Sequence, residues 1–256
     1  MNTNSNRKLM RLLDNHVQNT VLLASWLEKN GISRELQQYY VRSGWLESMG
    51  GGAFKRPKET VNWEGEIYSL QVQAQKPFHV GGLTSLSLLG LAHFVRLPTE
   101  TVYIYSPIQT KLPKWFDDPR WMARIKHIRS SFLPDNTALF EFRENNIFLQ
   151  ISTAERAILE CLLLAPKYID LVECYQLFEG LANLRPKLVQ ELLEQCKSIK
   201  VKRLFLYMAD KAKHQWLQFI DQTKIELGKG DRVITKGGVY KNQYKISIPK
   251  ELDLTP

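Results

Sequence analysis

The sequence predicts an α+β protein, in which an N-terminal winged helix-turn-helix domain is followed by a mixed α/β C-terminal domain. Two observations carry this prediction. Residues 20–58 contain two helical segments, a tight turn between them and a glycine-tipped hairpin, in the order of a winged helix-turn-helix. After Pro98, strand-like runs join the helical segments. We therefore expect domains at residues 1–97, with a core at 5–58 and accessory helices, and at 98–256.

The helix-turn-helix follows an opening helix expected over residues 5–17. Four apolar residues of its first helix recur at helical spacing: Val21, Leu22, Trp26 and Leu27. Asn30-Gly31 ends this helix, because glycine adopts the left-handed C′ conformation without steric cost. Ser33 is placed to cap the next helix by accepting a hydrogen bond from a free backbone N–H group.

The second helix, which ends at Gly44, has two chemically different faces. Three residues are expected to face inward: Leu36, Tyr40 and Ser43. Polar residues of the other face, together with the cap and the wing, form the expected DNA-binding set: Ser33, Arg34, Gln37, Gln38, Arg42, Lys55 and Arg56. Arginine suits a guanine edge and glutamine an adenine edge in the major groove. We therefore expect Arg34, Gln37 and Gln38 to reach bases.

The wing is expected as two short strands, Trp45-Leu46 and Ala53-Phe54, around a tip at Met49-Gly50-Gly51-Gly52. Lys55 and Arg56 follow the tip and are expected to contact phosphates. Residues 1–58 carry nine Lys or Arg and four acidic residues, a net charge of +5 out of +9 for the whole chain. Phosphate contacts dominate affinity for nucleic acid, so this excess favours DNA binding. Helix-turn-helices also act as dimerisation or protein-docking modules, and this alternative stays open.

The remaining elements are predicted from hydrophobic periodicity and from the positions of glycine and proline. Helices are expected over residues 62–75 and, after Gly81-Gly82, over 80–95. Strands are expected at 102–105, 124–132 and, as a hairpin, at 138–143 and 147–151. Ser152 and Glu155 form a capping-box pattern that opens a helix to Leu164. Further helices are expected at residues 170–181, 186–199 and 214–223, and closing strands near 244–248.

Composition and residue spacing argue against catalysis, metal binding and a membrane protein. The three cysteines form no CxxC pair, and the five histidines form no HxH, HExxH or HxxxH pattern. Asp117-Asp118 is adjacent and is not the DxD arrangement that holds metal on a triphosphate. The polar N-terminus has no signal-peptide core, and the apolar stretches are too short to span a bilayer. We expect a cytoplasmic protein with no catalytic residues, metal or cofactor.

Three groups of residues, in this order along the chain, resemble the AbiEi family of antitoxins and autoregulators of type IV toxin–antitoxin and abortive-infection systems. The first runs from Asn30-Gly31-Ile32-Ser33 through Tyr39-Tyr40 and Ser43-Gly44-Trp45-Leu46 to the wing before Lys55-Arg56-Pro57. The second is the glycine-led helix at Val80-Gly81-Gly82-Leu83-Thr84-Ser85-Leu86. The third is the helix opened by Ser152-Thr153-Ala154-Glu155-Arg156-Ala157.

The resemblance implies an N-terminal DNA-binding domain and a C-terminal α/β antitoxin domain. It also implies a partner toxin of the nucleotidyltransferase class, encoded alongside, and repression of the shared promoter through inverted repeats in double-stranded DNA. Whether antitoxin and toxin touch stays open. The alternatives are a winged-helix protein-docking module, a DNA-binding regulator without antitoxin activity and, least favoured, an enzyme acting on nucleic acid.

A basic cluster in the second domain is the expected antitoxin surface: Lys197, Lys200, Lys202, Arg203, Lys211 and Lys213. Its alternative interpretation is a solvated face without function. We expect antitoxin activity to reside after about Pro98, and DNA binding before it.

Overall fold

The computed structural model describes residues 10, 16–92, 101–117, 124–144 and 146–254 of the 256-residue chain. The chain divides into two compact units that interleave along the sequence. Unit 1 comprises Met1–His79, Leu97–His127 and Glu141–Gln150, and unit 2 comprises Val80–Arg96, Ile128–Phe140 and Ile151–Pro256. The expected single boundary near Pro98, and most of the opening helix expected over residues 5–17, lie outside the described residues.

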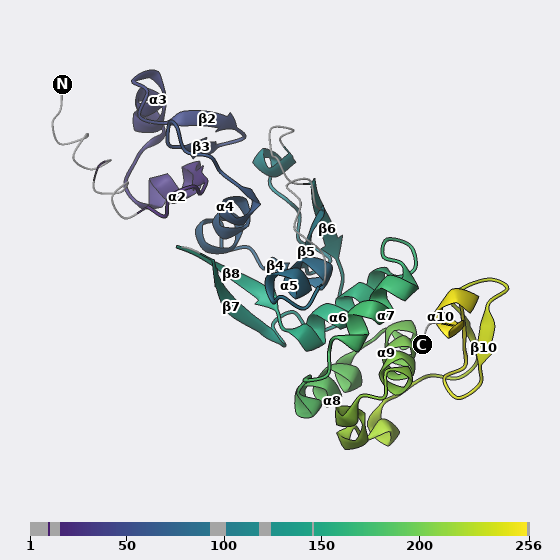
Figure 1. Cartoon of the computed structure of the whole chain (residues 1–256). Helices are drawn as coiled ribbons and strands as arrows, with labels where there is room; N and C mark the ends of the chain where they lie inside the picture. The colour runs from purple at the N-terminus through teal and green to yellow at the C-terminus, as the bar shows by residue number, and fades with distance from the viewer. Residues whose placement is uncertain (1–9, 11–15, 93–100, 118–123, 145, 255–256) are drawn as a thin grey trace. The chain divides into compact units, whose positions relative to one another are not determined.

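Unit 1 begins with the helix-turn-helix and its wing (Figure 1). Its first elements are β1 (Leu22–Leu23), α2 (Ala24–Lys29), α3 (Arg34–Arg42), β2 (Glu47–Gly50), β3 (Ala53–Lys55), α4 (Trp63–Tyr68) and the π-helix η1 (Ser69–Gln73). The three strands form an antiparallel sheet in the order β1-β3-β2. The winged helix-turn-helix arrangement is therefore confirmed.

The first wing strand starts later than the sequence predicts. Trp45-Leu46 was expected in this strand, but both backbone N–H groups donate to the Tyr40 carbonyl at the end of α3. Leu46 is buried in a cluster with four other residues: Leu22, Leu27, Ile32 and Tyr40. The two residues therefore complete the helix-turn-helix core, and β2 begins at Glu47.

A larger sheet contains the strands expected between residues 102 and 151. Its order is β6-β5-β4-β8-β7, from β4 (His79–Val80), β5 (Thr101–Ser106), β6 (Arg124–Arg129), β7 (Leu139–Glu144) and β8 (Ile147–Ser152). β7 and β8 are neighbours, as the hairpin prediction requires. β4 is an addition: these two residues lie beside the glycine-led helix and pair in parallel with β8 through Val80 and Ile151.

Unit 2 is built around one apolar helix, α6 (Ala154–Leu164), which contacts four other helices (Figure 1). These are α5 (Gly82–Leu88), α7 (Leu171–Glu179), α8 (Pro186–Gln195) and α9 (Ile199–Lys211). α5 is shorter than the predicted 80–95 helix. Its end is closed by bonds from Gly90 N to Ser87 O and from Leu91 N to Leu86 O, a pairing typical of helix C-termini.

Short elements complete the chain. They are the 3₁₀ helices η2 (Lys114–Asp117), η3 (Gln215–Phe219) and η4 (Gln222–Lys224), the strands β9 (Arg232–Val233), β10 (Val239–Lys241) and β11 (Ile246–Ile248), and α10 (Lys250–Leu254). The closing strands form a sheet in the order β10-β11-β9. The amphipathic helix expected at 214–223 is replaced by the short 3₁₀ turns η3 and η4.

Candidate nucleic-acid interface

The exposed face of α3 carries three of the predicted DNA-binding residues. Arg34, Gln38 and Arg42 are all exposed and recur every four residues, which places them on one side of the helix. Ser33 caps α3 as predicted, and its hydroxyl accepts a bond from Leu36 N at 3.4 Å. Gly31, with φ of 81°, occupies the left-handed position after α2 that the turn requires.

Gln37 does not belong to this face, and its predicted role in base reading is wrong. The residue is 1% exposed. Its Nε2 donates to Ala24 O at 3.1 Å and to Ile32 O at 3.0 Å, so the amide ties α3 to α2 and to the turn. The buried side of α3 runs through residues 36, 37, 40 and 41, so Leu36 and Tyr40 face inward as expected and Gln37 joins them. Ser43, expected inside, is exposed.

Arg34 forms an ion pair with an acidic residue of the preceding helix. Its Nε lies 2.6 Å from Glu28 Oε1, and both side chains are about half exposed, at 55% and 40%. The terminal nitrogens Nη1 and Nη2 have no hydrogen-bond partner among the described residues. Sequence reasoning missed Glu28, because the turn alone brings residue 28 of α2 beside residue 34 of α3.

The two wing cations are both engaged within the unit. Lys55 Nζ lies 3.2 Å from Glu47 Oε2 and donates to Glu59 O at 3.1 Å. Arg56 Nε lies 3.6 Å from Glu59 Oε1. Both cations are partly exposed. The charges of both cations are therefore partly balanced within the unit, and a phosphate that contacts them would bind close to these carboxylates.

The glycine tip of the wing packs against a later segment of unit 1. A Cβ atom added at Gly51, whose φ is +58°, would lie 2.9 Å from both the backbone N and the Cβ of Trp115. Trp115 lies in η2 and is buried, in edge contact with Phe116 at 5.3 Å between ring centroids. The tip is held by residues outside the predicted N-terminal domain.

Two members of the predicted antitoxin surface are buried, which corrects that prediction. Lys202 is 3% and Arg203 1% exposed. The Arg203 guanidinium donates to four backbone carbonyls at 2.8–3.0 Å, those of Leu227, Gly228, Gly230 and Lys245. It holds the loop before β9 and the start of β11 in place. In the sequence, Lys202 and Arg203 stand among apolar residues of α9, and no motif indicates that Arg203 binds backbone carbonyls.

The other four cations of this set are dispersed. Lys200 Nζ donates to the carbonyls of Leu163 and Ala165 at the end of α6, and burial lowers its pKa. Lys211 Nζ lies 5.2 Å from the Tyr175 ring centroid. Lys197 and Lys213 are exposed. The six residues thus do not form one exposed surface.

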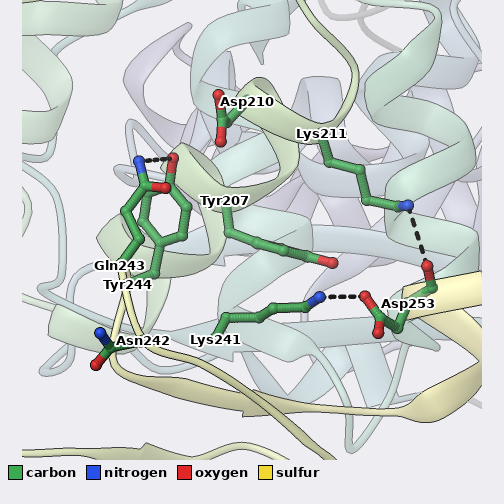
Figure 2. Close-up of a pocket in the computed structure, with 8 residues that line it drawn as sticks. All are labelled: Tyr207, Asp210, Lys211, Lys241, Asn242, Gln243, Tyr244 and Asp253. Atoms are coloured by element: carbon green, nitrogen blue, oxygen red, sulfur yellow. Dashed lines mark hydrogen bonds and ion pairs between the residues drawn. The ribbon is translucent and has the colours of Figure 1, made fainter.

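Unit 2 contains a polar pocket of about 270 Å³ that the sequence did not predict. Figure 2 shows Lys241 pointing at the Asp253 carboxylate, with which it forms an ion pair, and Lys211 donating to the Asp253 carbonyl. At the other end, Gln243 donates to the Tyr244 hydroxyl at 3.0 Å. Burial raises the pKa of Tyr244, as do Asp210 and its hydrogen bond. The lining is electrically balanced, with two lysines and two aspartates.

The second and third motifs of the family resemblance meet in a buried polar network. Glu160 of α6 accepts bonds from Gly82 N and Ser152 Oγ at 2.8 Å, and from Arg156 Nε at 2.8 Å. Ser85 Oγ donates to Ser152 O at 2.6 Å. The predicted capping box is wrong, because Thr153 occupies the N-cap position and Ser152 bonds to Glu160 instead. The glycine-led motif therefore anchors α5 to α6.

Glu155, the other half of the predicted capping box, binds Arg185 instead. Arg185 Nε and Nη2 donate to its two oxygens at 2.9 and 3.0 Å. Burial opposes ionisation of Glu155, but the bonds from Arg185 outweigh it and lower the pKa of this carboxyl. The motif residues thus serve the fold of unit 2.

Within the described ranges, no group of three or more His, Cys, Asp or Glu residues could hold a metal ion. The three cysteines are buried and unpaired with one another, and burial raises the pKa of each thiol. No helix in the part of the chain that the structure describes is long and apolar enough to cross a membrane.

Comparisons with known proteins agree with this architecture. Residues 5–97 match the family model of the AbiEi antitoxin N-terminal domain, described as a transcriptional regulator, and residues 99–249 match that of the AbiEi antitoxin transcriptional regulator of type IV toxin–antitoxin systems. No curated protein matches. The crystal structure of the RV2827C protein from Mycobacterium tuberculosis superposes with a TM-score of 0.63 and 15% identity, over 96% of this chain and 91% of that chain, and so shares its fold. The chain therefore belongs to the AbiEi antitoxin family, whose members are non-enzymatic transcriptional regulators of type IV toxin–antitoxin systems.

Proposed function

We propose that this protein represses its own promoter in the cytoplasm by placing α3 in the major groove of double-stranded DNA, and that it counters a toxin of the nucleotidyltransferase class. The family supplies the coarser role of transcriptional regulator and antitoxin. The operator, the toxin class and the DNA-contacting residues are the proposal.

The exposed face of α3 is the observation that carries the DNA-binding part. Arg34, Gln38 and Arg42 project from one side of a capped helix beside a three-stranded wing. Arginine can donate two bonds to guanine, and glutamine can pair with adenine, so Arg34 and Gln38 suit base edges. Arg42, Lys55 and Arg56 suit phosphates. Inverted repeats in the operator would match two copies of this module.

Adjacent glutamines provide a matched test. Gln38→Ala should leave stability within about 0.5 kcal/mol, as is usual for exposed sites. It should reduce the preference for operator over random DNA by about 1–3 kcal/mol, the value of one good base contact. Gln37→Ala should instead destabilise the protein by about 1–3 kcal/mol, because it leaves the Ala24 and Ile32 carbonyls without their donor.

The measurements are duplex binding at fixed salt with the full chain, and denaturant unfolding of each variant. If Gln38→Ala and Arg34→Ala both keep the discrimination of the unchanged protein, α3 does not read the operator. The protein-docking alternative predicts that outcome.

The antitoxin part is supported by the family match over residues 99–249. The exposed cations Lys197 and Lys213 remain candidates for this activity. Charge reversal at both, with the fold and repression intact, should weaken rescue of cells that express the partner toxin. The matched control is reversal at Lys229, an exposed lysine outside the predicted set. Full rescue by the double variant would leave these two lysines as solvated surface.

A further inference from the structure

The ion pair between Arg34 and Glu28 has a geometry that bears on how the protein discriminates bases. The carboxylate engages the guanidinium through Nε alone, at 2.6 Å. A guanidinium has five N–H donors in a fixed plane, so this bond leaves the four terminal N–H donors on Nη1 and Nη2. Those two nitrogens form the edge that binds O6 and N7 of guanine together.

Glu28 and Arg34 lie on elements whose relation is fixed by buried groups. The Gln37 amide bonds to Ala24 O of α2 and to Ile32 O of the turn. Leu27 of α2 and Tyr40 of α3 share the unit's apolar cluster with Ile32. Because neither helix can shift without breaking these contacts, the backbones of residues 28 and 34 stay at a constant separation, and an ion pair between their side chains limits the rotamers of both.

We propose that Glu28 is a positioning residue for base recognition: it orients the Arg34 guanidinium so that its terminal edge is presented to a guanine in the operator. The inference rests on the proposed DNA-binding function and adds to it a residue that touches no DNA. An exposed arginine would otherwise sample many rotamers, and a side chain held in advance loses less entropy on binding.

The proposal predicts opposite effects on operator and random DNA. Without Glu28, Arg34 is less ordered, so discrimination at the base pair that Arg34 reads should fall about two- to five-fold, the range expected for an exposed ion pair. Removal of a negative charge beside the DNA should leave affinity for random duplexes unchanged or higher. General damage to the fold would instead weaken binding to every sequence.

The experiment measures the full-length protein against an operator duplex, each of its single-base-pair variants and a random duplex. Arg34→Ala first identifies the base pair whose discrimination depends on Arg34. Glu28→Ala should reduce discrimination at the same base pair and at no other. In the Arg34→Ala background, Glu28→Ala should cause no further loss of discrimination. Glu28→Gln, which keeps a carbonyl oxygen to accept the Nε–H bond, should restore part of the discrimination.

Glu35→Gln is the matched control, because Glu35 is an exposed acid of α3 with no ion-pair partner among the described residues, and glutamine keeps an oxygen for the hydrogen bond with the capping Ser33. It should raise affinity for all sequences alike. The proposal is overturned if Glu28→Ala leaves the Arg34-dependent base pair unchanged, or weakens operator and random DNA equally. If the unchanged protein does not prefer the operator, the proposed function itself fails, which is a different result.

Discussion

At the scale of single residues, Glu66 of α4 is a carboxyl group buried without a hydrogen-bond partner among the residues that the structure describes. It is 1% exposed, and neither oxygen accepts a hydrogen bond from the described part of the chain. Burial, with a smaller contribution from Glu64, raises its pKa to about 8. Because the protonated form is the one the folded state accepts, unit 1 holds a neutral carboxylic acid at neutral pH.

Glu66 should make the protein less stable as the pH rises. The folded pKa of about 8 exceeds the ordinary value of 4.5, so the unfolded chain binds fewer protons between these values. Stability should therefore be greatest below pH 4.5 with respect to this group, fall as the pH rises and level off above pH 8. Urea unfolding of the unchanged protein and of Glu66→Gln at pH 5, 7 and 9 checks this. The two proteins should differ in slope against pH, and parallel curves would contradict the assignment.

The buried Arg203 guanidinium should contribute measurably to the free energy of unfolding. Arg203→Lys should cost about 2–5 kcal/mol, because a lysine cannot reach four carbonyls that lie around a planar fork, and each buried acceptor left unpaired costs about 1–3 kcal/mol. Denaturant unfolding measures the loss. Lys213→Gln, an exposed change in the same predicted set, should stay within about 0.5 kcal/mol. Equal stability of the two variants would mean that the Arg203 bonds are not important.

At the scale of elements, the wing depends on contacts that its own sequence does not contain. Its tip packs on Trp115, and its strand β3 is paired on both sides, with β1 and β2. Both wing cations bind carboxylates of the same unit. The wing is thus a supported edge of unit 1, and its position should respond to changes around η2.

Two glycines of the tip separate backbone strain from packing. Gly50 and Gly51 both have positive φ, 85° and 58°, but a Cβ at Gly50 meets nothing within 4 Å, whereas one at Gly51 meets Trp115 at 2.9 Å. Both alanine variants carry the left-handed penalty of roughly 1–2 kcal/mol. Gly51→Ala should be less stable than Gly50→Ala by a further 1–3 kcal/mol or so, from overpacking. Thermal unfolding of the two variants tests the difference; a reversed order would argue against the contact.

At the scale of the whole molecule, the functional division predicted at Pro98 does not coincide with the boundaries of the compact units. The family models meet between residues 97 and 99. Unit 1 also includes Leu97–His127 and Glu141–Gln150. Within unit 1, Gln71 exchanges two hydrogen bonds with the backbone of Gln150, at 2.9 and 3.1 Å. Unit 1, which contains the helix-turn-helix, therefore includes residues from beyond the first family model.

A fragment of residues 1–97 should keep the helix-turn-helix but loosen the wing. The apolar cluster beneath α3 lies wholly within residues 22–46, so backbone amides of α3 should remain protected from hydrogen exchange. The fragment lacks Trp115, on which the wing tip packs, so amides of the wing around residues 50–53 should exchange faster than in the full chain. Equal protection of the wing in both proteins would show that the later segments do not support it.

The sequence by itself determined the order of the elements, the turn after Gly31, the Ser33 cap and the family. Local rules decide these features: periodicity, glycine at left-handed positions and hydroxyl caps. Only the tertiary structure decided that Gln37 lies inside and Gln38 outside, that Glu28 meets Arg34, and that Arg203 holds the loop before β9. A polar residue near the edge of a helix face satisfies either environment, and the choice depends on which distant carbonyls need a donor.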